Sequence, residues 1–264
     1  MKLNSFLSSK RLFLLVKRDI ISNKLAILVV FGAIFVGVYL NSLINIYSST
    51  PSSTLYSSLF ANIIFISGFI ITSIQFKEIH KKETAQDYLL IPASTFEKFL
   101  SRLLLSTIGF ALLALAGLTL MSYMVEGINT LIFGRHSIPF YPFSGEVFKA
   151  IAHYFVAQSI FFLGAIYFRK YNFIKTINSI FIFLFALAIL GVIFTRIVYH
   201  DIFSEFLRSD NFYFQLHLNS LPIESDRARM LVRTAKILYW IIPAPLFWTI
   251  SYFRLKETEV KNAL

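Results

Sequence analysis

Long apolar runs without charge constrain this chain more than any other feature of its sequence. Hydrophobic residues make up 56% of the 264 residues and charged residues only 15%. A soluble domain carries about a quarter charged residues. Runs of about 20 apolar residues are long enough to cross the hydrocarbon core of a bilayer as α-helices. The sequence therefore predicts an all-α, polytopic integral membrane protein.

Length and apolarity predict six transmembrane helices, at 25–47, 55–75, 99–124, 148–168, 174–198 and 237–253. The fourth contains His153 and Gln158, for which hydrogen bonding between helices is favoured over contact with a substrate. The sixth contains Pro243 and Pro245, which we expect to kink it because proline lacks a backbone donor. Segment 126–146, rich in glycine and proline, is predicted to be a loop.

The basic residues predict the orientation of the spans. If the N-terminus is cytoplasmic, seventeen Lys and Arg residues lie on the inner side and eight on the outer side. This asymmetry follows the positive-inside rule, so both termini are expected inside. The outer segment 199–236 is an exception to this rule, since it holds most of the outer basic residues, from Arg208 onward. Apolar and polar residues alternate over 212–219, which suggests an extended stretch or a membrane-hugging loop, and a helix is predicted from Ser225-Asp226. The whole chain, 1–264, is predicted to be a single membrane domain.

Residues 1–24 carry six basic residues and one acid, Asp19. On a helical projection the basic residues gather on one side and apolar residues on the other: Lys10, Arg11, Lys17 and Arg18 against Leu12, Phe13, Val16 and Ile20. This pattern predicts an amphipathic helix at the cytoplasmic interface of the membrane. A charge cluster that only sets the topology is the alternative.

Residues 76–102 form the only long charged segment between two apolar runs in the first half of the chain. They include five Lys or Arg residues and four acids. Ser94-Thr95-Phe96-Glu97 has the pattern of a capping box, in which the serine hydroxyl and the glutamate carboxylate satisfy backbone donors reciprocally. Such a cap contributes about 1 kcal/mol. We therefore predict that a helix starts at Ser94 and continues into the third span, so that the segment is a folded connector.

This connector resembles that of bacterial type-2 ABC transporter permeases. The residues that carry the resemblance are Leu89, Leu90, Pro92, Ala93, Ser94, Glu97 and Lys98. The resemblance implies a short coupling helix that docks on a separate ATP-binding subunit. It also implies a second permease subunit, so that the two form a homodimer or a heterodimer in the cytoplasmic (inner) membrane. Two structural features are implied as well: an interfacial N-terminal helix and short re-entrant helices in 199–236. The residues then expected to contact the partner are Lys77, Glu78, Lys81, Lys82, Leu89, Pro92, Ser94, Glu97 and Lys98.

The sequence lacks the motifs of catalysis. It has no G-x-x-x-x-G-K phosphate loop, no G-x-S-x-G, no cysteine, and no metal-ligand spacing among its histidines. We therefore expect no enzyme activity and no cofactor, with ATP hydrolysed on a separate subunit. The basic residues behind the net charge of +11 flank the apolar runs. This distribution does not favour nucleic acid as a partner. The alternatives are a stand-alone channel, an ion-coupled carrier or a membrane scaffold. A membrane enzyme acting on lipid is disfavoured.

Overall fold

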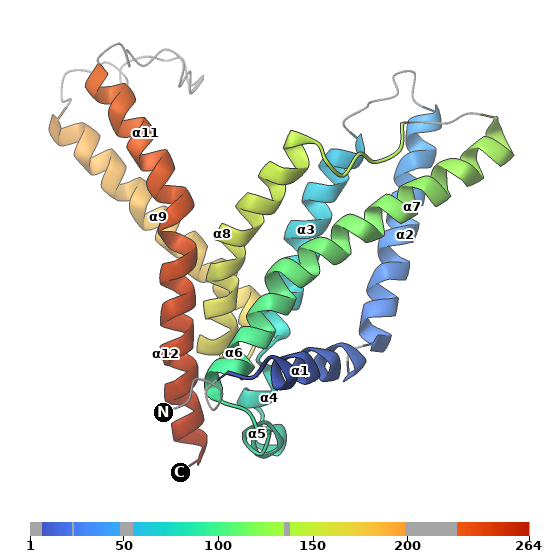
Figure 1. Cartoon of the computed structure of the whole chain (residues 1–264). Helices are drawn as coiled ribbons and strands as arrows, with labels where there is room; N and C mark the ends of the chain where they lie inside the picture. Colours follow the sequence, from blue (N-terminus) through green and yellow to red (C-terminus); the bar gives the residue numbers. More distant parts are fainter. Residues whose placement is uncertain (1–6, 23, 48–54, 135–137, 199–225, 264) are drawn as a thin grey trace. The chain divides into compact units, whose positions relative to one another are not determined.

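The computed structural model describes residues 7–22, 24–47, 55–134, 138–198 and 226–263, and within these ranges all regular structure is helical. The chain divides into two compact units, Met1–Phe173 with Ala244–Leu264 (unit 1) and Ile174–Pro243 (unit 2) (Figure 1). The helices are α1 Ser9–Ser22, α2 Lys24–Tyr47, α3 Leu55–Ile74, α4 Lys77–His80, α5 Lys82–Leu89, α6 Thr95–Leu104, the π-turn η2 Leu105–Gly109, α7 Phe110–Phe133, α8 Gly145–Tyr167, α9 Asn172–Val198, α11 Asp226–Ile241 and α12 Pro243–Ala263.

Among the described residues, four helical segments are long and apolar enough to cross a membrane. They are Tyr56–Ile74, Thr95–Phe133, Gly145–Tyr167 and Asn172–Ile193. They coincide with the second to fifth predicted spans and indicate a multi-pass membrane protein. Helix α2 covers the first predicted span, but its described apolar stretch, Ile34–Ile44, is shorter. The predicted alternation at 212–219 lies outside the described residues.

The helix of the third span is longer than predicted, and the loop expected from residue 126 is wrong. Helix α7 continues to Phe133 and ends at Gly134, whose left-handed backbone (φ 62°) closes the last turn with a hydrogen bond to the Thr130 carbonyl. Gly127 stays inside the helix, because one interior glycine costs only about 1 kcal/mol. The burial of Glu126 and Asn129 on one side of α7 offsets that cost.

The predicted sixth span is two helices rather than one kinked helix. Helix α11 ends at Ile241 and α12 begins at Pro243. A residue that precedes proline is disfavoured in the α conformation, so Ile242 interrupts the helix. Proline is favourable at the first helical position, where a backbone donor has no partner to lose, and Pro245 also lies in this first turn.

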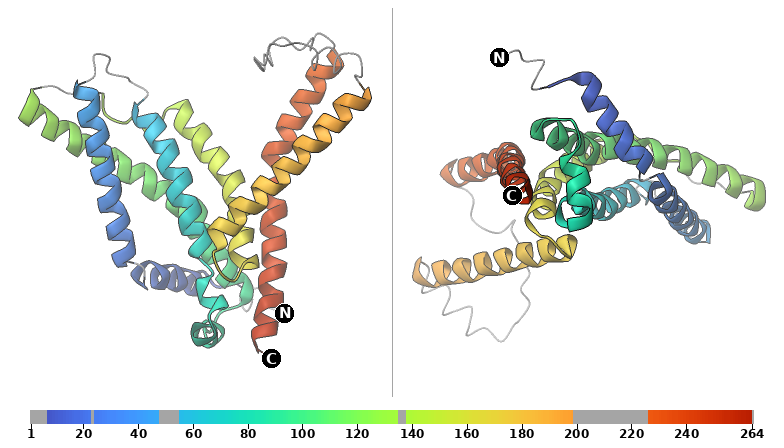
Figure 2. Two further views of the ribbon diagram at one scale, coloured as in Figure 1. Left: turned by 180° about the vertical axis from the view of Figure 1, so that it is seen from behind. Right: turned by 90° about the horizontal axis from the view of Figure 1, so that it is seen from below.

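Unit 1 has two apolar clusters. The larger joins α2, α3, α7 and α8 and includes Val38, Phe60, Ile64, Leu118 and Tyr154. The smaller joins the connector to α6, α8 and α12, and consists of Phe76, Ile79, Tyr88, Phe99, Phe162, Ala165, Ile166 and Leu255. Helices α1, α4 and α5 all lie at the end of unit 1 that holds this smaller cluster, which we call the connector end. There α1 runs across the long helices rather than along them (Figures 1 and 2).

Unit 2 contains most of α9 and all of α11. Every side chain described between Phe181 and Ile193 is exposed, and nearly all are apolar. An exposed apolar helix of this length is what a hydrocarbon environment requires, since all its backbone groups bond within the helix.

Candidate functional site

The connector folds back on the helices that it joins. Ile79 of α4 and Tyr88 of α5 are buried, and the Phe76 ring packs edge-on against the Phe162 ring of α8 with centroids 5.2 Å apart. The Thr84 hydroxyl donates to the Glu78 carbonyl at 2.8 Å, which ties α5 to α4. The connector is therefore a packed part of unit 1 at the connector end.

Side chains cap the helix ends that meet there. The last four carbonyls of a helix have no partner within the helix. In α8, the Ala165 carbonyl accepts from His80 Nε2 at 2.9 Å and from Asn172 Nδ2 at 3.0 Å, and the same Asn172 group donates to the Ser73 carbonyl of α3 at 3.3 Å. Burial lowers the pKa of His80 below its ordinary value, with the nearby Arg169 acting in the same sense, although the Ala165 carbonyl favours the charged form.

The predicted capping box at Ser94 is confirmed. The Ser94 hydroxyl accepts from the Glu97 N–H at 3.2 Å, and Glu97 Oε2 accepts from the Ser94 N–H at 3.0 Å. The other carboxylate oxygen, Oε1, accepts from the Ser8 N–H at 2.7 Å and from Arg11 Nε at 3.1 Å. Glu97 is fully buried. One carboxylate thus binds the N-termini of both α6 and α1, where helix dipoles favour negative charge.

Arg102 links α6 to the start of the connector. Its Nη2 lies 2.8 Å from Glu78 Oε2, and its Nη1 donates to the Gln75 carbonyl. The guanidinium carbon is 5.0 Å from the Phe76 ring centroid and 4.9 Å from that of Tyr88. The side chain is only 5% exposed. The cation–π contacts and the charge-assisted hydrogen bond compensate this guanidinium for the water that it loses on burial.

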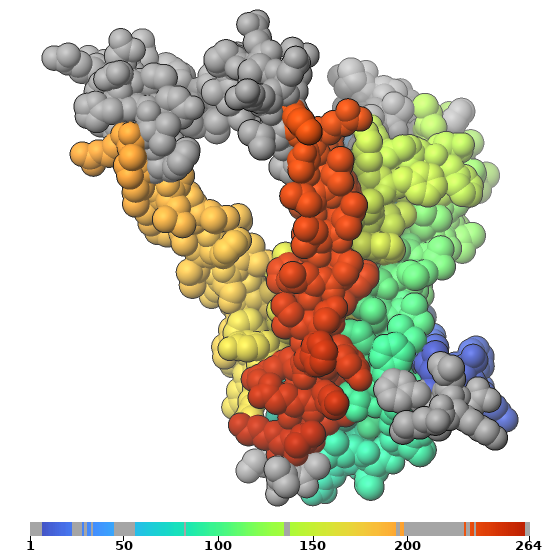
Figure 3. Space-filling view, turned by 60° about the vertical axis from the view of Figure 1, so that its left-hand side comes forward, coloured from blue at the N-terminus to red at the C-terminus, as the bar shows by residue number. Residues whose placement is uncertain are grey.

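Lys98 links α6 to α5 and α12. Its ammonium donates to the Tyr88 carbonyl at 3.0 Å, lies 4.7 Å from the Tyr88 ring centroid, and is 3.9 Å from Glu259 Oε1 of α12. The Thr95 hydroxyl donates to the other Glu259 oxygen. Figure 3 shows α12 in surface contact with the connector end of unit 1.

Seven charged side chains at this end form three ion-paired sets, which together we call the charged cluster. It consists of Arg11, Arg18, Glu78, Glu97, Lys98, Arg102 and Glu259, from α1, α4, α6 and α12. Glu78 pairs with two cations, since Arg18 Nη2 lies 3.7 Å from the same Oε2 that Arg102 contacts. Burial raises the pKa of Asp19, next to this cluster, although Arg102 and Arg18 act in the opposite sense.

The structure separates the predicted partner-contacting residues into two groups. Glu78, Ser94, Glu97 and Lys98 belong to the charged cluster and its cap, and Leu89 is partly buried. Lys77, Lys81 and Pro92 are exposed, and the side chain of Lys82 lies outside the described residues. The roles of Arg11, Arg18 and Glu259 were not predicted from the sequence, because these residues lie far from the connector in the chain.

A second polar group lies at the other end of α7 and was also missed. Glu126 Oε1 accepts from the Ser42 hydroxyl of α2 at 3.0 Å and from the Tyr56 hydroxyl of α3, and Asn129 Nδ2 donates to Ser42 Oγ at 2.8 Å. All four residues are buried. At 1.5 Å per residue, Glu126 is about 36 Å from Arg102 along the helix. This distance is slightly more than the hydrocarbon thickness of a bilayer, which is about 30 Å.

The two polar residues of the fourth span differ in their surroundings. Gln158 is fully buried and donates to Ser106 Oγ of the third span at 2.9 Å, which confirms the prediction of interhelical hydrogen bonding for this residue. His153 is exposed on α8.

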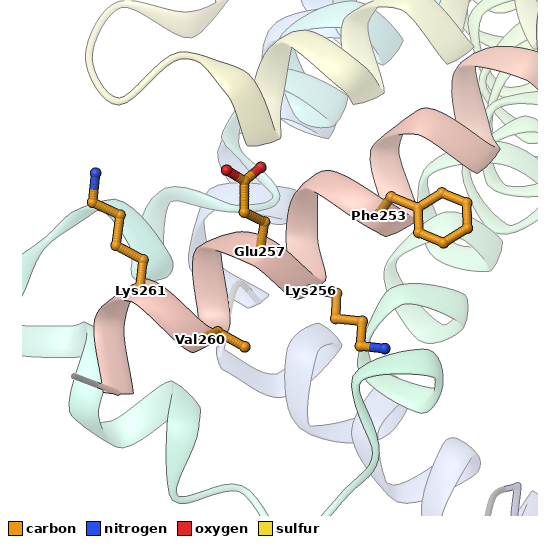
Figure 4. Close-up of a pocket in the computed structure, with 5 residues that line it drawn as sticks. All are labelled: Phe253, Lys256, Glu257, Val260 and Lys261. Carbon is orange, nitrogen blue, oxygen red and sulfur yellow. The ribbon is translucent and has the colours of Figure 1, made fainter.

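A shallow groove lies on α12. Figure 4 shows that Phe253, Lys256, Glu257, Val260 and Lys261 all come from this single helix and point to different sides of it. This arrangement encloses no ligand site. Within the described ranges, no group of three His, Cys, Asp or Glu side chains could hold a metal ion.

Comparisons of this chain with models of protein families, with curated proteins and with solved structures find no match.

Proposed function

We propose that this chain is the membrane subunit of an ATP-driven ABC exporter in the cytoplasmic membrane. In this proposal six spans form half of a translocation path, with both termini and the connector in the cytoplasm. A second permease subunit, identical or related, supplies the other half. A separate ATP-binding subunit docks on the connector. Helix α1 lies in the membrane interface, with Phe13 (66% exposed) and Ile21 (53% exposed) against lipid.

One observation carries the proposal: the connector is fixed on its inner side and exposed on its outer side. Its inner side, which includes α6, joins α1 and α12 through the charged cluster. Its outer side presents charged and apolar groups from α4, α5 and the turn that follows. These exposed residues are Lys77, Lys81, Glu83, Gln86, Asp87, Leu90 and Pro92. Leu90 is 80% exposed and offers an apolar contact among the charged groups of this face.

The same contacts give a path for movement into the membrane. A displacement of α5 is passed to α6 through the Lys98 ammonium on the Tyr88 carbonyl, and a displacement of α4 through Arg102 on Glu78. Helix α6 starts at a capping box and continues through η2 into α7. A continuous helix that starts in the connector and crosses the membrane is suited to pass on movement from a nucleotide-driven partner.

Charge reversal on the exposed face tests this function. The double variant Lys77→Glu/Lys81→Glu changes two exposed residues outside the charged cluster. It should lose an associated ATPase that co-purifies with the wild-type chain from its native membranes. Lys256→Glu/Lys261→Glu on α12 is the matched control, with two exposed lysines and the same charge change, and should keep the ATPase. If no protein with a phosphate-binding loop associates with the wild-type chain, the stand-alone membrane protein replaces the exporter subunit.

A further inference from the structure

The helix of the third span contains a π-turn. In η2 the N–H of Phe110 bonds to the carbonyl of Leu105, five residues earlier, and also to that of Thr107. In an α-helix this N–H would bond to the Ser106 carbonyl, four residues earlier. The Ser106 carbonyl therefore does not accept the Phe110 N–H. Single π-turns inside helices are rare and are frequently found at functional sites.

Helix α8 supplies the groups that hold this turn. The Tyr154 hydroxyl donates to the Ser106 carbonyl at 2.6 Å, and Gln158 Nε2 donates to the Ser106 hydroxyl at 2.9 Å. Tyr154 and Gln158 are fully buried and four residues apart, so they lie on one face of α8. Gln158 Oε1 is buried without a hydrogen-bond partner. That oxygen is a second acceptor within the same face of the helix.

A π-turn contains one residue more than the α-turn that it replaces. Its conversion to an α-turn would rotate α6 against α7 by one residue, about 100° around the helix axis. Helix α6 carries Glu97, Lys98 and Arg102, and their bonds to α1, α5, α4 and α12 fix its present rotation. The state of the turn and the state of the charged cluster are therefore linked.

We propose that η2 is a two-state register switch in the third span. In the state seen here, the Tyr154 hydroxyl occupies the Ser106 carbonyl and the turn stays π. In the other state the Phe110 N–H takes the Ser106 carbonyl, the Tyr154 hydroxyl moves to Gln158 Oε1, and α6 rotates by about 100°. Movement of the connector drives this switch, and only in this respect does the switch rest on the proposed function.

Cysteine labelling of the full chain tests the switch without ATP or a partner. The sequence has no cysteine, so Ser101→Cys places one thiol on the buried side of α6, where Ser101 is 1% exposed. Tyr154→Phe should raise the labelling rate of this thiol about tenfold, the equivalent of one lost hydrogen bond. Ser73→Cys on α3, equally buried at the same end, should stay slow in both backgrounds.

Deletion of Ile108 gives the decisive control. This residue is half exposed within η2, and its removal turns the π-turn into an α-turn while both flanking faces keep their present directions. In the deleted chain, Tyr154→Phe should no longer expose Ser101→Cys. Three results would overturn the switch: no effect of Tyr154→Phe in the full chain, the same increase in the deleted chain, or equal labelling of Ser73→Cys, which indicates unfolding instead.

Discussion

Glu97 is the residue whose removal tests the charged cluster most sharply. In Glu97→Ala, the Ser94 and Ser8 N–H groups lose their acceptor, and Arg11 loses its carboxylate. Each lost cap costs about 1 kcal/mol. The Arg11 side chain is 40% exposed, so screening limits the ion pair to about 1 kcal/mol or less. The expected loss in the free energy of unfolding is about 2–3 kcal/mol.

Denaturant unfolding in detergent micelles measures this loss from the shift of the midpoint. Ser94→Ala removes one cap and leaves the α1 contacts in place, so it should cost only about 1 kcal/mol. Trypsin supplies a local readout, because α1 contains Lys10, Arg11, Lys17 and Arg18. Released α1 should be cut faster in Glu97→Ala and not in Ser94→Ala. If the two variants lose equal stability and resist trypsin equally, Glu97 does not hold α1 on α6.

Three further predictions follow from single positions. The folded state favours neutral His80. The stability that this residue contributes is therefore complete above the ordinary histidine pKa of about 6.5. It is lost as the pH falls from that value toward the lower pKa of the folded state. His80→Gln should therefore flatten the pH dependence of Tm between about pH 7.5 and 5.5. A Cβ on Gly68 would lie 2.5 Å from the Tyr154 ring, so Gly68→Ala should cost about 1–3 kcal/mol, while Gly37→Ala, with nothing within 4 Å, should cost nothing; equal Tm values for the two would contradict this packing. Single cysteines at the exposed positions Gln86 and Leu131 should label from opposite sides of the membrane, and labelling of Gln86→Cys from outside would refute the orientation.

Local patterns were the part of this fold that the sequence could predict. The capping box at Ser94 follows from four consecutive residues, and the spans follow from composition and length alone. The prediction failed where a local signal was ambiguous. Gly127 indicated a turn but lies within α7, and the two prolines near residue 243 indicated a kink where the helix ends.

The long-range part of the site has no local signal. Glu97 meets Ser8 and Arg11 across 89 and 86 residues of chain, and Glu259 reaches Lys98 from the last helix. Each of these charges alone is typical of a solvated helix face. The π-turn is equally hidden, since the hydroxyl that bonds its Ser106 carbonyl belongs to Tyr154, on a different helix.

The proposed docking surface is tested most directly by cross-linking from Leu90. A photoreactive residue at this position, 80% exposed, should cross-link in native membranes to a polypeptide with a phosphate-binding loop. The same residue at Leu112, 62% exposed on α7 within the third span, should give no such product. A Leu90 cross-link that carries this ATPase is the result that the account predicts. Cross-links to the ATPase from Leu112 but not from Leu90, or to no protein from Leu90, would contradict it.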